Sequence, residues 1–208
     1  MEMRKEEIIE IGKRLYSKNL TVATSGNISV KTEKGIYITA SGSSLGCLKK
    51  EDIILIDKDG KEISQGKASS EKKLHVEIYK LRKDVNAIIH THPVYLTSFA
   101  VCNKPLDEPI MSENILYFED IPVAEYAMPS SAELAEKTVK YFKKRDVVMM
   151  ANHGAIAVGS NLEQAFLKME TAEYYAKVCV VTKNIGGCHY LSKKQVNELL
   201  KLKKIKES

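Results

Sequence analysis

Three of the five histidines in this 208-residue chain stand where apolar runs end, at positions suited to metal binding. His90 and His92 close the run that begins at residue 87, and Pro93 follows them. Side chains alternate between the two faces of a strand, so both imidazoles can point the same way. Taken alone, such a pair is as often two surface or hydrogen-bonded histidines as it is a metal site.

A third histidine changes this balance. His153 lies between the apolar runs 147–150 and 155–158, and we expect Gly154 to permit a backbone turn that other residues disfavour. Alone, His153 would be interpreted as a turn histidine that hydrogen-bonds its neighbours. Together with His90 and His92 it completes a three-histidine set, which is a common ligand set of catalytic zinc with one open position.

Glu71 is a carboxylate that could serve such a site. It follows Ser69 and Ser70 at a predicted helix start, where Ser70 as N-cap and a favourable charge–dipole interaction would explain it. The same geometry would also place a base beside N–H groups that can bind phosphate, and the pattern leaves both interpretations open. His75, one turn later, is favoured as a buried supporting residue over a metal ligand. His189 is interpreted as structural.

The elements expected around these residues alternate irregularly between strand and helix. Apolar periodicity predicts helices over 6–16, 70–82, 94–102, 131–144 and 162–183, and another from 193, with Ser131 as an N-cap. Strands are predicted over 27–31, 35–39, 53–56, 87–90, 147–150 and 155–158, and the segment from 103 to 130 is predicted to be irregular. No linker or repeat divides the chain. We therefore predict one α/β domain over residues 1–208.

Composition argues against two classes of partner. The net charge of +5 is nearly all lysine interleaved with acidic residues, without an arginine-rich patch next to aromatic residues, so nucleic-acid binding is not expected. No apolar run is long enough to span a membrane, and no signal sequence is evident at the N-terminus. The four cysteines form no CxxC pair and are expected to be reduced thiols. We expect a cytoplasmic protein with no membrane partner.

Five short motifs occur together: TSGNIS at 24–29, TASG at 39–42, SSE at 69–71, HTH at 90–92 and NHG at 152–154. In order and spacing they resemble the class II aldolase family, and within it most closely the L-fuculose-1-phosphate aldolases. L-ribulose-5-phosphate 4-epimerases and the head domains of adducins are similar to the same family. The resemblance spans nearly the whole chain, and five motifs in register are far more specific than any one of them.

The resemblance implies a mixed, largely antiparallel sheet flanked by helices, and one Zn²⁺ per subunit bound by His90, His92 and His153. Glu71 would be a further zinc ligand that moves off to act as the catalytic base. Six residues of the first three motifs would hold the substrate phosphate: Gly26, Asn27, Ser41, Gly42, Ser69 and Ser70. The implied reaction is reversible cleavage of a 1-phospho-2-ketose, such as L-fuculose 1-phosphate, into dihydroxyacetone phosphate and an aldehyde such as L-lactaldehyde. A homotetramer with active sites at subunit interfaces is also implied.

Two departures from the fuculose-phosphate aldolases concern the aldehyde end of the substrate. Their tyrosine from a neighbouring subunit, which protonates the aldehyde oxygen, corresponds to Met111 here. Tyr117 and Tyr126 lie nearby in the sequence. Tyr117 could take the place of the family's tyrosine, or it could be an ordinary packed residue, and both interpretations stay open. The C-terminal segment 203–208 lacks a second tyrosine of the family.

Three alternatives stay open. A methylthioribulose-1-phosphate dehydratase would use the same histidines and glutamate. A 4-epimerase would carry aspartate where Glu71 stands, so Glu71 favours an aldolase. A non-catalytic, adducin-like interaction module would not need the metal ligands, and their joint presence favours an enzyme.

Overall fold

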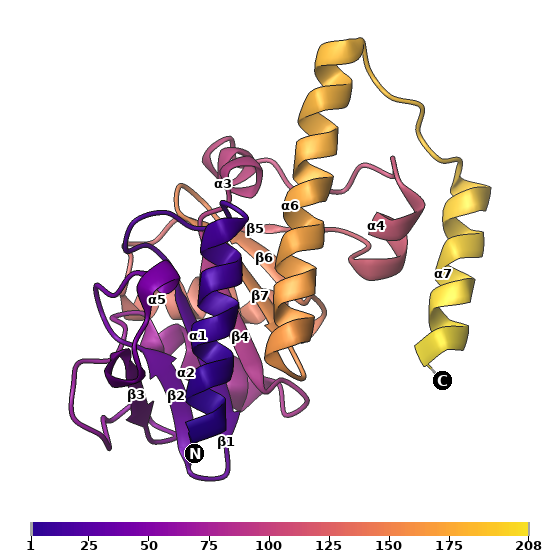
Figure 1. The fold of residues 1–208 in the computed structure, drawn as a ribbon. Helices are drawn as coiled ribbons and strands as arrows, with labels where there is room; N and C mark the ends of the chain where they lie inside the picture. Colours follow the sequence, from indigo (N-terminus) through magenta and orange to yellow (C-terminus); the bar gives the residue numbers. More distant parts are fainter. Residues whose placement is uncertain (1, 208) are drawn as a thin grey trace.

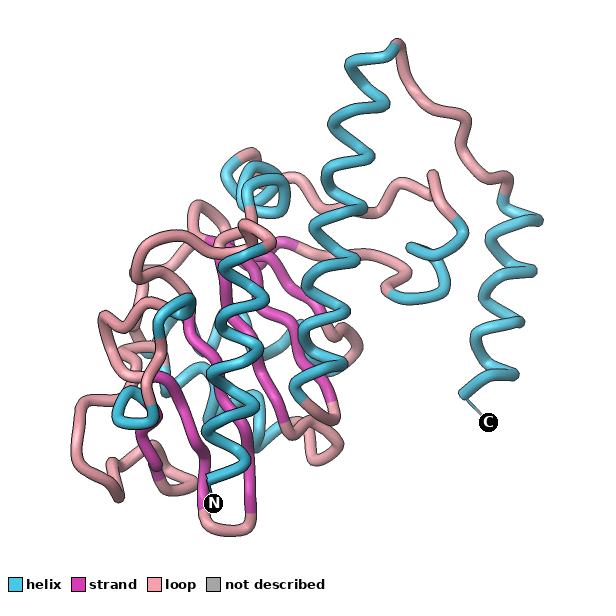
Figure 2. Tube along the Cα trace, viewed as in Figure 1, coloured by secondary structure: helices cyan, strands magenta, loops and turns pink. Residues whose placement is uncertain are grey.

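A seven-stranded mixed sheet forms the centre of the protein, whose computed structural model describes residues 2–207 (Figures 1 and 2). Its strands are β1 (Asn27–Thr32), β2 (Gly35–Thr39), β3 (Ile53–Ile56), β4 (Ala87–Thr91), β5 (Val123–Ala124), β6 (Val147–Met150) and β7 (Gly154–Gly159). Their order is β3-β2-β1-β4-β7-β6-β5, and every pair is antiparallel except β5 with β6. The predicted α/β class with a largely antiparallel sheet is confirmed.

Helices cover both faces of the sheet. One apolar cluster joins α1 (Glu2–Ser17), α3 (Val94–Val101) and α6 (Leu162–Ile185) to one face, and a second joins α2 (Lys72–Leu81) and α5 (Ala132–Val139) to the other (Figure 1). Strand β4 shows the alternation behind this division, because Ile89 belongs to the first cluster and Ile88 to the second. His90, two residues after Ile88, therefore faces the layer that contains α2.

Two further helices extend to one side of this sandwich. Helix α4 (Ser112–Tyr117) packs against α6 and against α7 (Lys193–Glu207), and α7 lies apart from the sheet in Figure 1. The chain between α6 and α7 is tied down where Leu191 N donates to Pro109 O at 2.8 Å. Within residues 2–207, no helix is long and apolar enough to cross a membrane.

Three predicted elements need correction. Helix α2 begins at Lys72 instead of Ser70, because residues 69–71 form a turn in which Lys72 N donates to Ser69 O at 3.1 Å. Ser131 does cap α5, accepting from Leu134 N at 3.0 Å, but the α-helix ends at Val139 and a 3-10 turn (Lys140–Lys143) replaces its expected last turn. The segment predicted to be irregular holds α4 and the short strand β5.

Candidate active site

The sheet register places His90 beside Asn27. These two residues are partners across β4 and β1, and His90 is 1% exposed. The His90 Nδ1 lies 2.9 Å from the carbonyl oxygen of Ala155. A carbonyl can only accept a hydrogen bond, so Nδ1 carries the proton and Nε2 is left to face the site.

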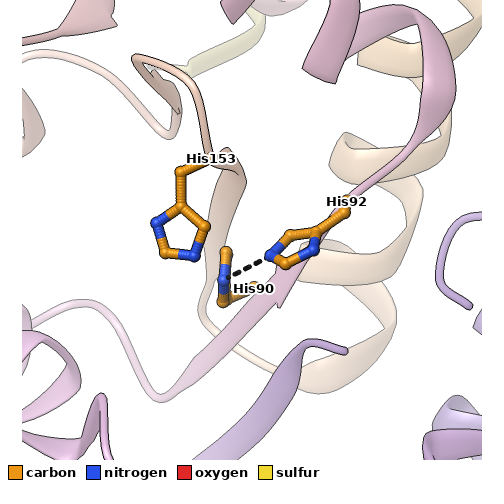
Figure 3. A group of neighbouring side chains, drawn as sticks. All are labelled: His90, His92 and His153. Carbon is orange, nitrogen blue, oxygen red and sulfur yellow. Dashed lines mark hydrogen bonds between the residues drawn. The ribbon is translucent and has the colours of Figure 1, made fainter. Parts of the chain in front are cut away.

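His92 and His153 bring two more rings to the same point (Figure 3). The His92 Nε2 is 3.1 Å from the His90 Nε2, and the three ring centroids are 4.8–5.1 Å apart. His153 is presented by the turn between β6 and β7, in which Asn152 has a φ of +56°. The three predicted histidines therefore converge.

The predicted reason for Gly154 was wrong. Its backbone is not in the left-handed region, which in this turn is occupied by Asn152. Gly154 is required because a Cβ there would overlap the His92 ring and lie 2.7 Å from the carbonyl oxygen of Thr91. Glycine at this position thus makes room for a histidine of the site.

Glu71 joins the cluster from the turn before α2. Its Oε2 lies 3.1 Å from His90 Nε2 and accepts a 2.9 Å hydrogen bond from Asn27 Nδ2, while its Oε1 lies 3.4 Å from His153 Nε2. The residue is 8% exposed, and its side chain caps no helix N–H group. The interpretation of Ser70 as N-cap with Glu71 in the first helical turn was therefore wrong, because Glu71 itself is the N-cap residue and its carboxylate points at the histidines.

The charges in this cluster are coupled. Burial raises the pKa of Glu71, but the imidazoles of His90 and His153 and the hydrogen bond from Asn27 outweigh burial and lower it. Burial lowers the pKa of His90, and Glu71 more than reverses that effect, so the net direction is upward. Burial and repulsion by His90 lower the pKa of His92 to about 3 and that of His153 to about 4. Glu71 is therefore ionised and both outer histidines are neutral at neutral pH.

This donor set fits a metal cation. The ligand atoms of His90, His92 and His153 lie within 4.8 Å of one another, and the Glu71 carboxylate borders them. Glu71 Oε1 and His153 Nδ1 are buried without a hydrogen-bond partner among the described residues. Several lone pairs directed at one point need a positive charge between them, and three imidazoles with a carboxylate suit zinc.

Two of the predicted phosphate-binding residues border the histidines. Gly26 has a φ of +84°, and a Cβ there would lie 2.6 Å from the His90 carbonyl oxygen, so glycine is required on two counts. Asn27 is 4% exposed, and its amide group binds Glu71. Its Oδ1 is buried without a partner among the described residues. The bond from Asn27 to Glu71 was not predicted, although its place beside His90 in the sheet would have indicated it.

The other four form a shelf before α2. An isolated bridge pairs Ala40 with Ala68, which brings Ser41 and Gly42 beside the serine turn. Gly42 has a φ of +78° and nothing within 4 Å of its missing Cβ, so its backbone borders open space. Ser69 Oγ accepts from Glu71 N at 3.3 Å. The exposed Ser70 accepts a 2.8 Å hydrogen bond from Ser130, a residue that no motif singled out.

The remaining histidines lie outside the cluster. His75 is fully buried, and its Nδ1 is 2.7 Å from Ser29 Oγ, which in turn is 2.8 Å from the Tyr79 hydroxyl. His75 contacts β1 through Ser29, and the prediction that it is buried is confirmed. His189 is exposed in the connection between α6 and α7.

The two tyrosines considered for the aldehyde end are both exposed, and the residue at the position of the family's tyrosine begins a helix. Met111 is the N-cap residue of α4. Tyr117 is 60% exposed at the end of α4 and lines a hollow of about 370 Å³ with four residues of α6. Tyr126 is 53% exposed.

The chain matches a known protein family over most of its length. Residues 6–180 match the family described as Class II Aldolase and Adducin N-terminal domain. The chain belongs to this family. The predicted resemblance is thereby confirmed.

Curated relatives and a solved structure are similar over nearly their whole length. The L-fuculose phosphate aldolase of Methanocaldococcus jannaschii is 40% identical over 179 residues, which are 86% of this chain and 97% of the relative. The 5-deoxy-D-ribulose 1-phosphate aldolase of Bacillus thuringiensis is 33% identical over 205 residues, 97% of this chain and 95% of the relative. A solved L-fuculose 1-phosphate aldolase superposes with a TM-score of 0.88 at 34% identity, covering 96% and 95% of the two chains. The chain is therefore an enzyme of the aldolase type, and the differing names leave its substrate to be proposed.

Proposed function

We propose that the protein is a zinc-dependent aldolase that cleaves a 1-phospho-2-ketose of the L-fuculose 1-phosphate type, reversibly, to dihydroxyacetone phosphate and an aldehyde such as L-lactaldehyde. The observation that supports this most directly is the buried Glu71 carboxylate, 3.1 Å from His90 and 3.4 Å from His153. A base next to three converging imidazoles suits proton exchange on a carbon adjacent to a carbonyl group. The names of the relatives give the substrate class.

His90, His92 and His153 would hold the zinc, with Glu71 as a further ligand in the resting site. When bound, zinc supplies Lewis-acid stabilisation of the negative charge that develops on the substrate oxygens. His90 is fixed for this role by its bond to the Ala155 carbonyl, and such outer partners set both ring orientation and basicity.

Glu71 is the proposed catalytic residue. In the cleavage direction the C4 hydroxyl gives up its proton as the C3–C4 bond breaks and C4 becomes the aldehyde carbonyl carbon, and Glu71, once protonated, would deliver a proton to C3. In the synthetic direction its carboxylate would remove that proton from C3, and the aldehyde oxygen would gain one. The His90 and His153 imidazoles and the hydrogen bond from Asn27 lower the pKa of Glu71 despite its burial. Asn27 holds Oε2, so the carboxylate is oriented before substrate arrives.

The phosphate of the substrate would lie on the shelf before α2. Gly26, Asn27, Ser41, Gly42, Ser69 and Ser70 would contact it. The Ser70 hydroxyl is exposed, and the space beside the Gly42 Cα is open, so both leave room for a phosphate. A phosphate there would also meet the positive end of the helix.

We further propose a homotetramer, in which a neighbouring subunit completes the aldehyde end of the site. This would explain why Tyr117 lies against α6 of its own chain and not at the histidines. Exposed apolar side chains on α6 and α7, such as Ile185 at 77%, Ile205 at 70% and Leu202 at 51%, offer surface for association. A cytoplasmic location would keep the four free cysteines reduced.

A substrate panel tests the proposal. Zinc-loaded and chelator-treated protein would be mixed with L-fuculose 1-phosphate, 5-deoxy-D-ribulose 1-phosphate, methylthioribulose 1-phosphate and L-ribulose 5-phosphate. We expect zinc-dependent release of dihydroxyacetone phosphate from one of the first two, and its loss in Glu71→Gln. Turnover of only the last two substrates would replace the aldolase by a dehydratase or an epimerase.

A further inference from the structure

The helix that follows His92 has no capping side chain of its own. Its N-cap residue is Pro93, which supplies no side-chain hydrogen bond. The first turn of any α-helix leaves backbone N–H groups without partners inside the helix. In α3 the N–H groups of Tyr95 and Leu96 are partly buried, so they need an acceptor from elsewhere.

Glu173, near the middle of α6, supplies that acceptor. Its Oε1 accepts from Tyr95 N at 2.9 Å and its Oε2 accepts from Leu96 N at 2.8 Å. Both carboxylate oxygens are used, and the negative charge lies at the positive end of α3. Charge-assisted hydrogen bonds of this kind are stronger and more directional than neutral ones. The carboxylate therefore fixes the first turn of α3 against α6.

That turn begins only two residues after His92. The proline ring fixes φ at Pro93, which leaves the backbone between His92 and α3 little rotational freedom. The position of α3 therefore restricts the position of His92. On the other side, the His92 ring lies against Gly154, where no side chain could fit. His92 is therefore held on one side by α3, which is bound to Glu173, and on the other side by the backbone of β7. His90, by contrast, is held inside β4 and by Ala155.

We propose that Glu173 is a positioning residue of the metal site: by binding the N-terminus of α3 it holds the His92 imidazole where the other two histidines converge. This inference rests on the proposed metal-binding role of His92. Glu173 contacts none of the histidines and acts through the backbone of α3. Replacing Glu173 should therefore raise the dissociation constant for zinc, whether or not it also lowers the melting temperature.

The test compares Glu173→Gln with Glu170→Gln. Glu170 lies one turn earlier on α6 and forms a 2.8 Å ion pair with Lys18, so its replacement removes the same charge and leaves the two hydrogen bonds from Tyr95 and Leu96 to Glu173 in place. In Glu173→Gln, the amide can accept from only one of the two N–H groups, and its NH₂ group opposes the other. Zinc affinity would be measured by competition with a chromophoric chelator, and the melting temperature of each metal-free variant would be recorded beside it.

We expect Glu173→Gln to raise the dissociation constant for zinc at least about tenfold over that of Glu170→Gln, as loss of outer-shell partners does at other sites. Equal dissociation constants in these two variants would overturn the inference, even if Glu173→Gln melted lower. Should Glu173→Gln not fold, Glu173→Asp, which withdraws the carboxylate by one methylene, replaces it in the same comparison. His92→Ala separates failure of the metal site from failure of the role of Glu173. Unchanged zinc affinity in His92→Ala would overturn the metal site itself. Weakened zinc affinity in His92→Ala, together with normal zinc affinity in the Glu173 variant, would overturn only the role of Glu173.

Discussion

Gly154 of β7 lies directly against the imidazole ring of His92, leaving no room for a side chain between them. Gly154→Ala must displace either this ring or the backbone at Thr91. We expect zinc affinity to fall at least about tenfold and stability to fall by about 1–3 kcal/mol, because overpacking strains both elements. Chelator competition and urea unfolding would measure these effects. The matched control is Asn152→Gly, which relaxes a φ of +56° in the same turn and should bind zinc normally. Normal zinc binding by Gly154→Ala would contradict the described packing.

Removal of one histidine at a time tests the ligand set. His90→Ala, His92→Ala and His153→Ala should each abolish stoichiometric zinc binding after dialysis, because each removes one of three imidazoles within 4.8 Å. Metal analysis of purified protein by mass spectrometry would measure the content per chain. His189→Ala, in the exposed connection before α7, is the control and should retain wild-type metal content. Full metal content in any of the three variants would remove that histidine from the site.

Asn27 adds to the effect of His90 and His153 in lowering the pKa of Glu71, through its 2.9 Å hydrogen bond to Oε2. Asn27→Asp would replace this donor by a second carboxylate and so raise the pKa of Glu71, which the wild-type cluster holds below its usual value. A base with a raised pKa is lost to protonation at higher pH. The acidic limb of the kcat profile should therefore move toward neutral pH. The control is Asn86→Asp, the same substitution directly before Ala87, at the end of β4 opposite His90. An unmoved acidic limb in Asn27→Asp would show that Asn27 does not tune Glu71.

His75 makes the fold sensitive to acid. Burial and repulsion by His90 lower its pKa to about 3, whereas an unfolded histidine has a pKa near 6.5. Between these values the unfolded chain binds a proton that the folded chain does not, so stability falls as pH falls below about 6.5. His75→Gln removes this titration. In urea unfolding of metal-free protein, the wild type should lose about 1 kcal/mol more than the variant between pH 7 and pH 5.5. Equal losses would show that His75 is protonated in the fold.

The sequence predicted the elements better than the contacts between them. Apolar periodicity located every strand of more than two residues, and alternation in the strand at 87–91 predicted that His90 and His92 share a face. The start of α2 was wrong because a serine followed by glutamate is also an ordinary capping pattern. Only the tertiary position of the histidines shows that the Glu71 side chain turns away from the helix.

Contacts over long sequence separation could not be predicted from local patterns. Glu173 binds α3 across 78 residues, and Gly154 makes room for His92 across the sheet. Neither residue type predicts such a role, because a glutamate on an amphipathic helix is usually solvated and a glycine usually indicates a turn. The converging histidines were predictable for the opposite reason: three imidazoles at strand ends have few other uses in common.

Hydrogen exchange on dihydroxyacetone phosphate without any aldehyde isolates the proposed role of Glu71, since this step does not involve the aldehyde pocket. Zinc-loaded protein would be incubated with dihydroxyacetone phosphate in D₂O and followed by proton NMR. We predict stereospecific exchange of one hydrogen on the hydroxymethyl carbon, lost both on zinc removal and in Glu71→Gln with zinc retained. No exchange by the zinc-loaded wild type, or equal exchange by Glu71→Gln, would contradict the assignment of Glu71 as the base of an aldolase.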